Sequence, residues 1–141
     1  MTPGKSRIIA DVEGIGPVYG RKLKKIGIRT TGKLLLACRT PADRKRISKE
    51  TGITENLLLE WANRADLFRI KGVAEEYSDL LEVAGVDTVV ELAQRNPGNL
   101  YETIIEKSRE TGTQIVRRPP GKKQVESWVK QAKKLPRMLE Y

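Results

Sequence analysis

The stretch Gly14–Tyr19, Gly-Ile-Gly-Pro-Val-Tyr, decides the fold, because a related stretch follows it at a shift of 58 residues. There it aligns with Gly72–Tyr77, Gly-Val-Ala-Glu-Glu-Tyr. Of eleven aligned positions, six are identical and two pair Ile with Val: Gly14/Gly72, Ile15/Val73, Gly16/Ala74, Pro17/Glu75, Val18/Glu76, Tyr19/Tyr77, Leu23/Leu81, Gly27/Gly85, Ile28/Val86, Thr30/Thr88 and Leu34/Leu92. Self-similarity at a fixed shift predicts two copies of one structural unit.

The correspondence resumes downstream at a longer spacing. Leu58-x-x-Trp61-x-x-x-Ala65 matches Val125-x-x-Trp128-x-x-x-Ala132 at a shift of 67, so the second copy has gained 9 residues. We therefore predict a first unit over residues 7–66 and a second, degenerate unit over residues 67–135. We expect the two to pack about a pseudo-twofold axis as one compact domain.

Apolar residues at helical spacing, with turn signals between them, predict an all-α chain. Pro17 opens the first helix and Gly27 follows its end, which is where helices favour these two residues. The expected helices are 17–26, 31–38, 41–50, one capped by Thr54 that bears Leu57 to Ala65, 75–84, 88–95, 97–111 and 122–134. The prolines exclude a helix from the basic loop 112–123, which is either a nucleic-acid contact or a solvated connector.

The net charge of +9 favours an anionic partner, but the charge is unevenly distributed. Residues 1–65 carry 14 basic and 6 acidic side chains, a balance of +8. Residues 66–106 carry 3 and 9, a balance of −6, and residues 107–141 carry 10 and 3, a balance of +7. The middle of the chain is therefore acidic between two basic parts.

The residue types exclude many kinds of site. Cys38 is the single cysteine and there is no histidine, which removes disulfides, most zinc sites and any imidazole base. Cys38 lies in the apolar stretch 34–38, so we predict a core residue rather than a reactive thiol. We expect no cofactor, no metal and no small-molecule substrate. The chain shows neither a signal peptide nor a membrane span, so we expect a cytoplasmic protein.

Gly14 and Gly16 predict a tight turn whose backbone N–H groups face an unobstructed surface at the start of a helix. The positive end of a helix dipole and the free amides there favour an anion. Pro17 has no N–H, so we expect the donors to come from the turn, Val18 and Tyr19. The predicted nucleic-acid-binding residues are Gly14, Ile15, Gly16, Val18, Tyr19, Arg21, Lys22, Lys24, Lys25 and Arg29, with Arg117, Arg118, Lys122 and Lys123 from the basic loop.

This arrangement resembles the helix-hairpin-helix motif of sequence-nonspecific DNA-binding proteins, over residues 7–35 and less closely over 66–93. The resemblance implies that the Gly-hydrophobic-Gly hairpin binds backbone phosphate. The whole chain, including Ala65–Val73, Glu76–Leu81 and Glu91–Pro97, also resembles a bacterial family of tandem helix-hairpin-helix proteins, domain of unknown function 4332. That family has no established function, so this second resemblance implies the fold rather than a role.

The second copy departs from the motif. Ala74 replaces the second glycine, and Glu75 and Glu76 in the next helical turn would repel phosphate. Further carboxylates follow at Asp79, Glu82, Asp87 and Glu91. We interpret this copy as a packing partner or a protein-facing surface. The repeated aromatics, Tyr19 with Tyr77 and Trp61 with Trp128, could stack on bases, but their helical spacing favours the core.

Three functions are compatible with these features. The first is sequence-nonspecific nucleic-acid binding, to DNA rather than RNA, through backbone phosphates. The second is protein interaction or self-assembly, in which the basic first unit pairs with the acidic second unit. The third is an enzyme with a lysine nucleophile, which would need a lysine of lowered pKa beside a carboxylate. No motif provides that pair, so we expect no enzyme.

Overall fold

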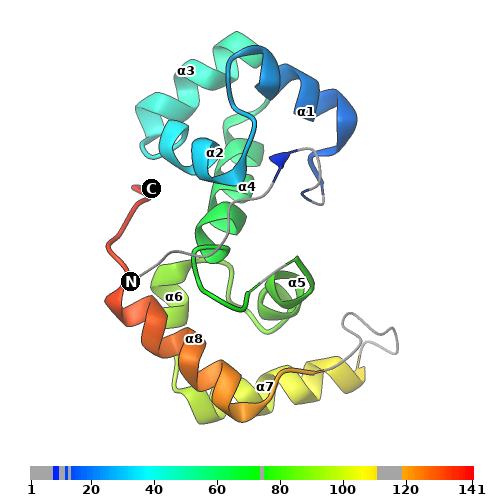
Figure 1. Cartoon of the computed structure of the whole chain (residues 1–141), viewed down its shortest axis with the longest axis vertical. Helices are drawn as coiled ribbons and strands as arrows, with labels where there is room; N and C mark the ends of the chain where they lie inside the picture. The colour runs from blue at the N-terminus through cyan, green and yellow to red at the C-terminus, as the bar shows by residue number, and fades with distance from the viewer. Residues whose placement is uncertain (1–7, 10–11, 13, 74, 111–118) are drawn as a thin grey trace. The chain divides into compact units, whose positions relative to one another are not determined.

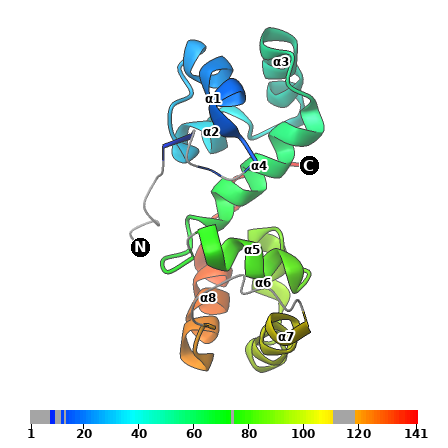
Figure 2. The same cartoon turned by 90° about the vertical axis from the view of Figure 1, so that its right-hand side faces the viewer.

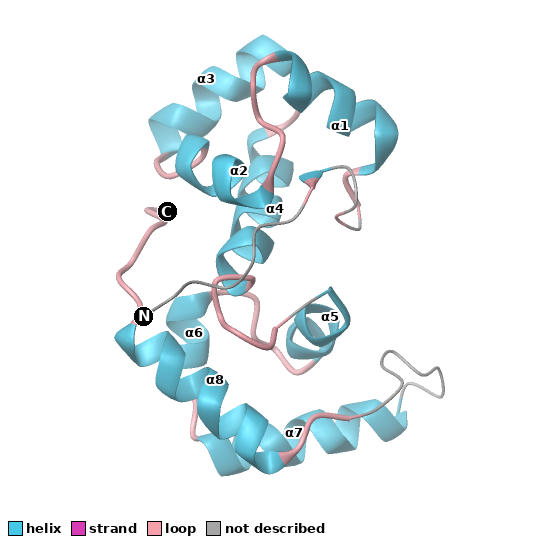
Figure 3. Cartoon of the chain, in the orientation of Figure 1, coloured by secondary structure: helices cyan, strands magenta, loops and turns pink. Residues whose placement is uncertain are grey.

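The computed structural model describes residues 8–9, 12, 14–73, 75–110 and 119–141. These residues form eight helices and no strand, which confirms the all-α fold class (Figure 3). The helices are α1 Gly16–Lys25, α2 Thr31–Ala37, α3 Pro41–Thr51, α4 Glu55–Leu67, α5 Glu75–Val83, α6 Val89–Gln94, α7 Pro97–Glu110 and α8 Lys122–Lys134. Most of the basic loop, including Arg117 and Arg118, lies outside the described residues.

Side-chain caps stand at the starts of α2, α3, α4, α6 and α7; those at Thr40, Thr54 and Asn96 were predicted from the sequence. The Thr30 hydroxyl accepts the Lys33 amide at 3.2 Å, and the Thr88 hydroxyl accepts the Glu91 amide at 3.0 Å. Such a cap satisfies a first-turn N–H that has no acceptor inside its helix. The same bond occurs at Thr40, Thr54 and Asn96.

The chain divides into two compact units. The N-terminal unit contains the described residues from 8 to 66 together with 137–141, and the C-terminal unit contains residues 67–136 (Figure 1). The internal duplication, and the packing of the two copies as one domain, remain predictions from the sequence.

The N-terminal unit has a core of aliphatic side chains around Trp61 and Cys38. Trp61 is 3% exposed and Cys38 is fully buried, as predicted for both. Burial raises the pKa of the Cys38 thiol from 9.0 to about 11, because a buried thiolate is poorly solvated. The surrounding core residues are Ile9, Val12, Ile15, Leu23, Ile28, Leu34, Leu35, Ile47, Ile53, Leu58, Ala62 and Ala65.

The C-terminal segment 137–141 completes the N-terminal unit, a contact that the sequence did not predict. Leu139 is 1% exposed. The buried guanidinium of Arg44 donates to the backbone oxygens of Cys38 at 2.9 Å and Glu140 at 2.8 Å. The Glu140 amide in turn donates to the Arg39 oxygen at 2.8 Å. The segment is therefore held by backbone hydrogen bonds and one buried leucine.

In the C-terminal unit, α8 packs on α6 and α7, and α5 packs on α7. Figure 2 shows α7 and α8 side by side. Trp128 of α8 is 1% exposed and lies among the aliphatic residues of this core. The two tryptophans are thus in the cores of separate units.

Candidate functional site

The glycine turn, residues 14–19, includes the first residues of α1, which begins at Gly16. Gly14 and Gly16 have φ of 90° and 65°, in the left-handed region that side chains rarely adopt. The Ile15 amide donates to the Val12 oxygen at 3.1 Å, and the Ile15 side chain is 2% exposed. The Ile15 side chain therefore anchors the turn in the core, so only backbone atoms of this predicted binding residue could face a ligand.

Trp61 supports the turn from beneath. A Cβ on Gly14 would lie 3.7 Å from the indole Nε1 of Trp61. The Tyr19 ring packs on Trp61 with a centroid distance of 5.2 Å and an interplanar angle of 59°. The Lys22 ammonium lies 6.0 Å from the centre of the Tyr19 ring. Trp61 therefore packs against both Gly14 and the Tyr19 ring and so supports the turn. Because Trp61 is only 3% exposed, its ring is too buried to stack on a base.

Among the described residues, nothing covers the outer side of the turn. A Cβ on Gly16 would meet none of their atoms within 4 Å, and Val18 is 55% exposed. In the first turn of α1, the amides of Gly16 and Val18 have no intrahelical acceptor, and Pro17 has no amide hydrogen. Two N–H donors and an unobstructed approach therefore coincide at the positive end of the helix.

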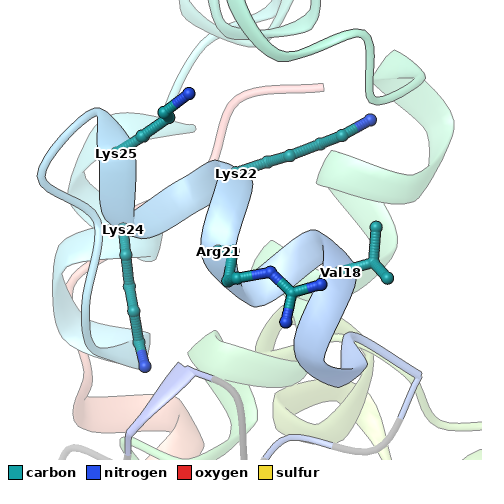
Figure 4. Close-up of a pocket in the computed structure, with 5 residues that line it drawn as sticks. All are labelled: Val18, Arg21, Lys22, Lys24 and Lys25. Atoms are coloured by element: carbon teal, nitrogen blue, oxygen red, sulfur yellow. The ribbon is translucent and has the colours of Figure 1, made fainter.

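Beside this opening, the exposed face of α1 borders the cationic cleft, which has a volume of about 580 Å³ and is lined by Val18, Arg21, Lys22, Lys24 and Lys25. Figure 4 shows Val18, Arg21 and Lys22 projecting to one side of the helix, while the Lys24 and Lys25 ammonium groups diverge at its C-terminal end. Four cationic side chains of one helix thus line the cleft.

The charge of the cationic cleft is not neutralised internally. Among the described residues, no carboxylate lies within 4.0 Å of its four cations. Arg29 adds a fifth exposed cation after α1, where its backbone oxygen accepts the Ile9 amide at 2.9 Å. Crowded like charges without counterions raise the local potential and attract polyanions.

Four of the predicted residues are not among the described lining of the cleft. Lys122 and Lys123 are exposed at the start of α8 in the C-terminal unit, whereas the cleft belongs to the N-terminal unit. Arg117 and Arg118 are outside the described residues. The described lining of the cationic cleft therefore contains no residue of the basic loop.

The C-terminal unit contains an equivalent packing of glycine, tyrosine and tryptophan, but its helix α5 carries no lysine or arginine. A Cβ on Gly72, whose φ is 97°, would lie 3.2 Å from Nε1 of Trp128. Tyr77 packs on Trp128 at 5.1 Å and 52°. The support by Trp61 was missed by the sequence reasoning, although a signal was present, since a glycine and a distant tryptophan recur together in both aligned segments.

A family model matches residues 13–135, most of the chain. The chain belongs to the family described as "Domain of unknown function (DUF4332)". No curated protein and no solved structure is similar enough to this DUF4332 member to count as a match. Within its described part, none of the helices has the length and apolar character of a membrane span. The same residues contain no group of three or more His, Cys, Asp or Glu side chains placed to hold a metal ion.

Proposed function

We propose that this DUF4332 member binds nucleic acid, duplex DNA in the first place, through backbone phosphates and without reading the sequence. The glycine turn would act as a helix-hairpin-helix phosphate site, and the cationic cleft would hold the neighbouring phosphates. The observation that carries the proposal is the coincidence of an open, amide-bearing turn with four cations that have no described counter-charge.

The chemistry of the site favours phosphate over bases. Two backbone amides and four cationic side chains offer only donors, which suit the acceptor oxygens of a phosphate chain. Sequence reading needs side chains that contact base edges from a groove-bound element. The Trp61 ring, which could stack on a base, is buried under the turn. We accordingly expect duplexes of unrelated sequence to bind with the same affinity.

Salt dependence gives a quantitative test. Each phosphate neutralised on a duplex contributes about −0.9 to the slope of log K against log salt. Engagement of all four cleft cations therefore predicts a slope of about −3.6. Fluorescence anisotropy of a labelled DNA duplex over a series of salt concentrations measures this slope.

Two matched pairs of variants distinguish a loss of phosphate binding at the turn and cleft from the effects of backbone strain and of altered net charge. Gly16→Ala places a methyl group where phosphate would approach, whereas Gly52→Ala adds the same strain at φ 76° and in equally open space after α3. Lys22→Glu with Lys25→Glu alters the cleft, whereas Lys45→Glu with Lys49→Glu makes the same change in net charge on the exposed side of α3.

We expect Gly16→Ala to weaken duplex binding about tenfold, the equivalent of one charge-assisted hydrogen bond, with Gly52→Ala close to the parent. The cleft charge reversal should reduce affinity far more than the α3 reversal. Equal losses within either pair would refute the site, and absence of duplex binding at low salt would refute the function.

A further inference from the structure

Positive charge in the C-terminal unit is concentrated on helix α8. The sequence of α8 contains five lysines and a single carboxylate, Glu126, whereas α5 and α6 together contain five carboxylates and no lysine or arginine. Two of the five lysines were predicted to bind nucleic acid from the sequence. All five are exposed: Lys122, Lys123, Lys130, Lys133 and Lys134.

The five lysines lie on one side of α8, and we name them the lysine face. At 3.6 residues per turn, their positions span about 120° of the helix circumference. A second side of the helix packs in the core, where Val125, Trp128 and Val129 are at most 1% exposed. The remaining side presents the uncharged residues Gln124 and Ser127. The exposed surface of α8 is therefore divided into a cationic side and an uncharged polar side.

Helix α8 is firmly held within its unit. At its start, the Gln124 side-chain oxygen accepts the Gly121 amide at 2.9 Å. Near its end, the Gln131 side chain accepts the Lys71 amide at 2.8 Å and donates to the Lys71 oxygen at 3.1 Å. The helix packs on α6 and α7 along the edge of the C-terminal unit (Figure 1). The lysine face is thus presented by a fixed backbone, which a ligand does not have to order.

The charge of the lysine face is not neutralised within the described chain. No carboxylate of the described residues lies within 4.0 Å of its five ammonium groups. Glu126 stands four residues from both Lys122 and Lys130, a spacing at which helical ion pairs form, yet it pairs with neither. With Glu126 counted, this side of the helix has a net charge of +4. Such crowding of like charges attracts an anionic partner.

The packing of the helix does not require these lysines. Helix α4 aligns with α8 at the shift of 67 residues and has Trp61 at the position of Trp128. In the N-terminal unit, the cations of the cleft lie on α1 rather than on α4. At the positions aligned with the five lysines, α4 has Glu55, Asn56, Asn63, Asp66 and Leu67.

The composition of the lysine face favours a phosphate chain over a membrane or a protein. Among the described residues, none of the exposed large apolar side chains lies on α8, so the helix lacks the apolar side that membrane-surface helices insert. Lysine is depleted at protein–protein interfaces. From Lys122 to Lys134 the helix extends about 18 Å, and one strand of a duplex presents about five phosphates over that length. Five ammonium groups therefore match about five phosphates.

We infer that the lysine face is a second nucleic-acid-binding surface, which holds duplex phosphates by side-chain ammonium groups alone. The inference rests on the proposed function for the kind of ligand, but it uses neither the glycine turn nor the cationic cleft. Each of the two units then has a cationic surface of its own. The slope of log K against log salt should therefore be steeper than the value of about −3.6 for the cleft, and about −8 with all nine cations engaged.

Neutralising part of the lysine face provides the test, on full-length protein freed of nucleic acid by nuclease and high-salt washing. Lys130→Gln with Lys134→Gln, the α8 pair, removes two of its charges. Lys45→Gln with Lys49→Gln, the α3 pair, removes two exposed charges at the same spacing from α3. Glutamine matches lysine in helix propensity, and circular dichroism verifies that both variants fold.

Fluorescence anisotropy of a labelled duplex measures the salt slope and the affinity. The α8 pair should make the slope less steep by about 1.8, because two phosphate contacts are lost. For affinities that coincide at 1 M salt, this change weakens binding about 60-fold at 0.1 M. The α3 pair should keep the parental slope.

A parental slope for the α8 pair, or an equal change for the α3 pair, would overturn the inference. So would loss of binding to phosphatidylserine vesicles by the α8 pair at parental duplex affinity, since the face would then be a membrane contact. The Gly16→Ala variant separates the two proposals. Weakening by the α8 pair with parental binding by Gly16→Ala refutes the glycine turn and supports the lysine face, and the reverse result does the opposite.

Discussion

Replacing Leu139 by alanine tests whether the C-terminal segment is a structural part of the N-terminal unit. The Leu139 side chain is 1% exposed, and its neighbour Glu140 donates its amide to the Arg39 oxygen and accepts the Arg44 guanidinium at its backbone oxygen. A buried Leu→Ala change costs about 2–5 kcal/mol, depending on how far the site collapses. Because the segment is short and peripheral, it can move inward, so we expect about 2 kcal/mol.

Urea unfolding followed by Trp61 fluorescence in a Trp128→Phe background reports on the N-terminal unit, since each unit contains one tryptophan. For a slope of about 1–3 kcal/mol per molar urea, a loss of about 2 kcal/mol lowers the midpoint by about 1 M. Leu36→Ala is the matched control, because Leu36 is 59% exposed in the same unit. If Leu139→Ala lowers the urea midpoint no more than Leu36→Ala does, residues 137–141 do not contribute to the stability of the N-terminal unit.

Two further predictions concern the buried thiol of the N-terminal unit and the threonine caps of both units. The Cys38 thiol, with a pKa of about 11 against 9.0 when unfolded, should react with a disulfide reagent only on unfolding; rapid labelling of the native protein at pH 8 would contradict its burial. Because the folded pKa is the higher one, the stability contribution of the neutral thiol is full below pH 9 and is lost as the pH rises through about 11. Thr30→Ala and Thr88→Ala should each cost about 1 kcal/mol in urea unfolding, with serine at either position restoring most of it; no loss in either unit would show that the capping bonds are dispensable.

Local signals in the sequence predicted the helices well, because the physics that sets their ends is local. The threonine caps at 40 and 54 and the asparagine cap at 96 act over three residues, and a left-handed glycine ends a helix at the next position. The observed helices therefore begin and end within a few residues of the predicted ones. Within the candidate site, the exposed cations of α1 follow from the same helical period.

Long-range contacts could not be predicted in the same way. The segment 137–141 has no periodicity, and most of its bonds involve backbone atoms, which every sequence shares. Nor did the sequence reveal that Ile15 points into the core while Val18 stays exposed, because both are aliphatic residues at the edge of one turn. Such distinctions depend on which distant residues pack beneath the turn, here Trp61 under Gly14.

The return of residues 137–141 to the N-terminal unit also orders events during synthesis. The ribosome makes residues 137–141 later than the rest of this unit, because residues 67–136 of the C-terminal unit come between them in the sequence. Until Leu139 and Glu140 emerge, the Arg44 guanidinium lacks one of its two carbonyl acceptors. The nascent N-terminal unit can therefore fold early, but it reaches its final stability only after residues 137–141 have left the exit tunnel.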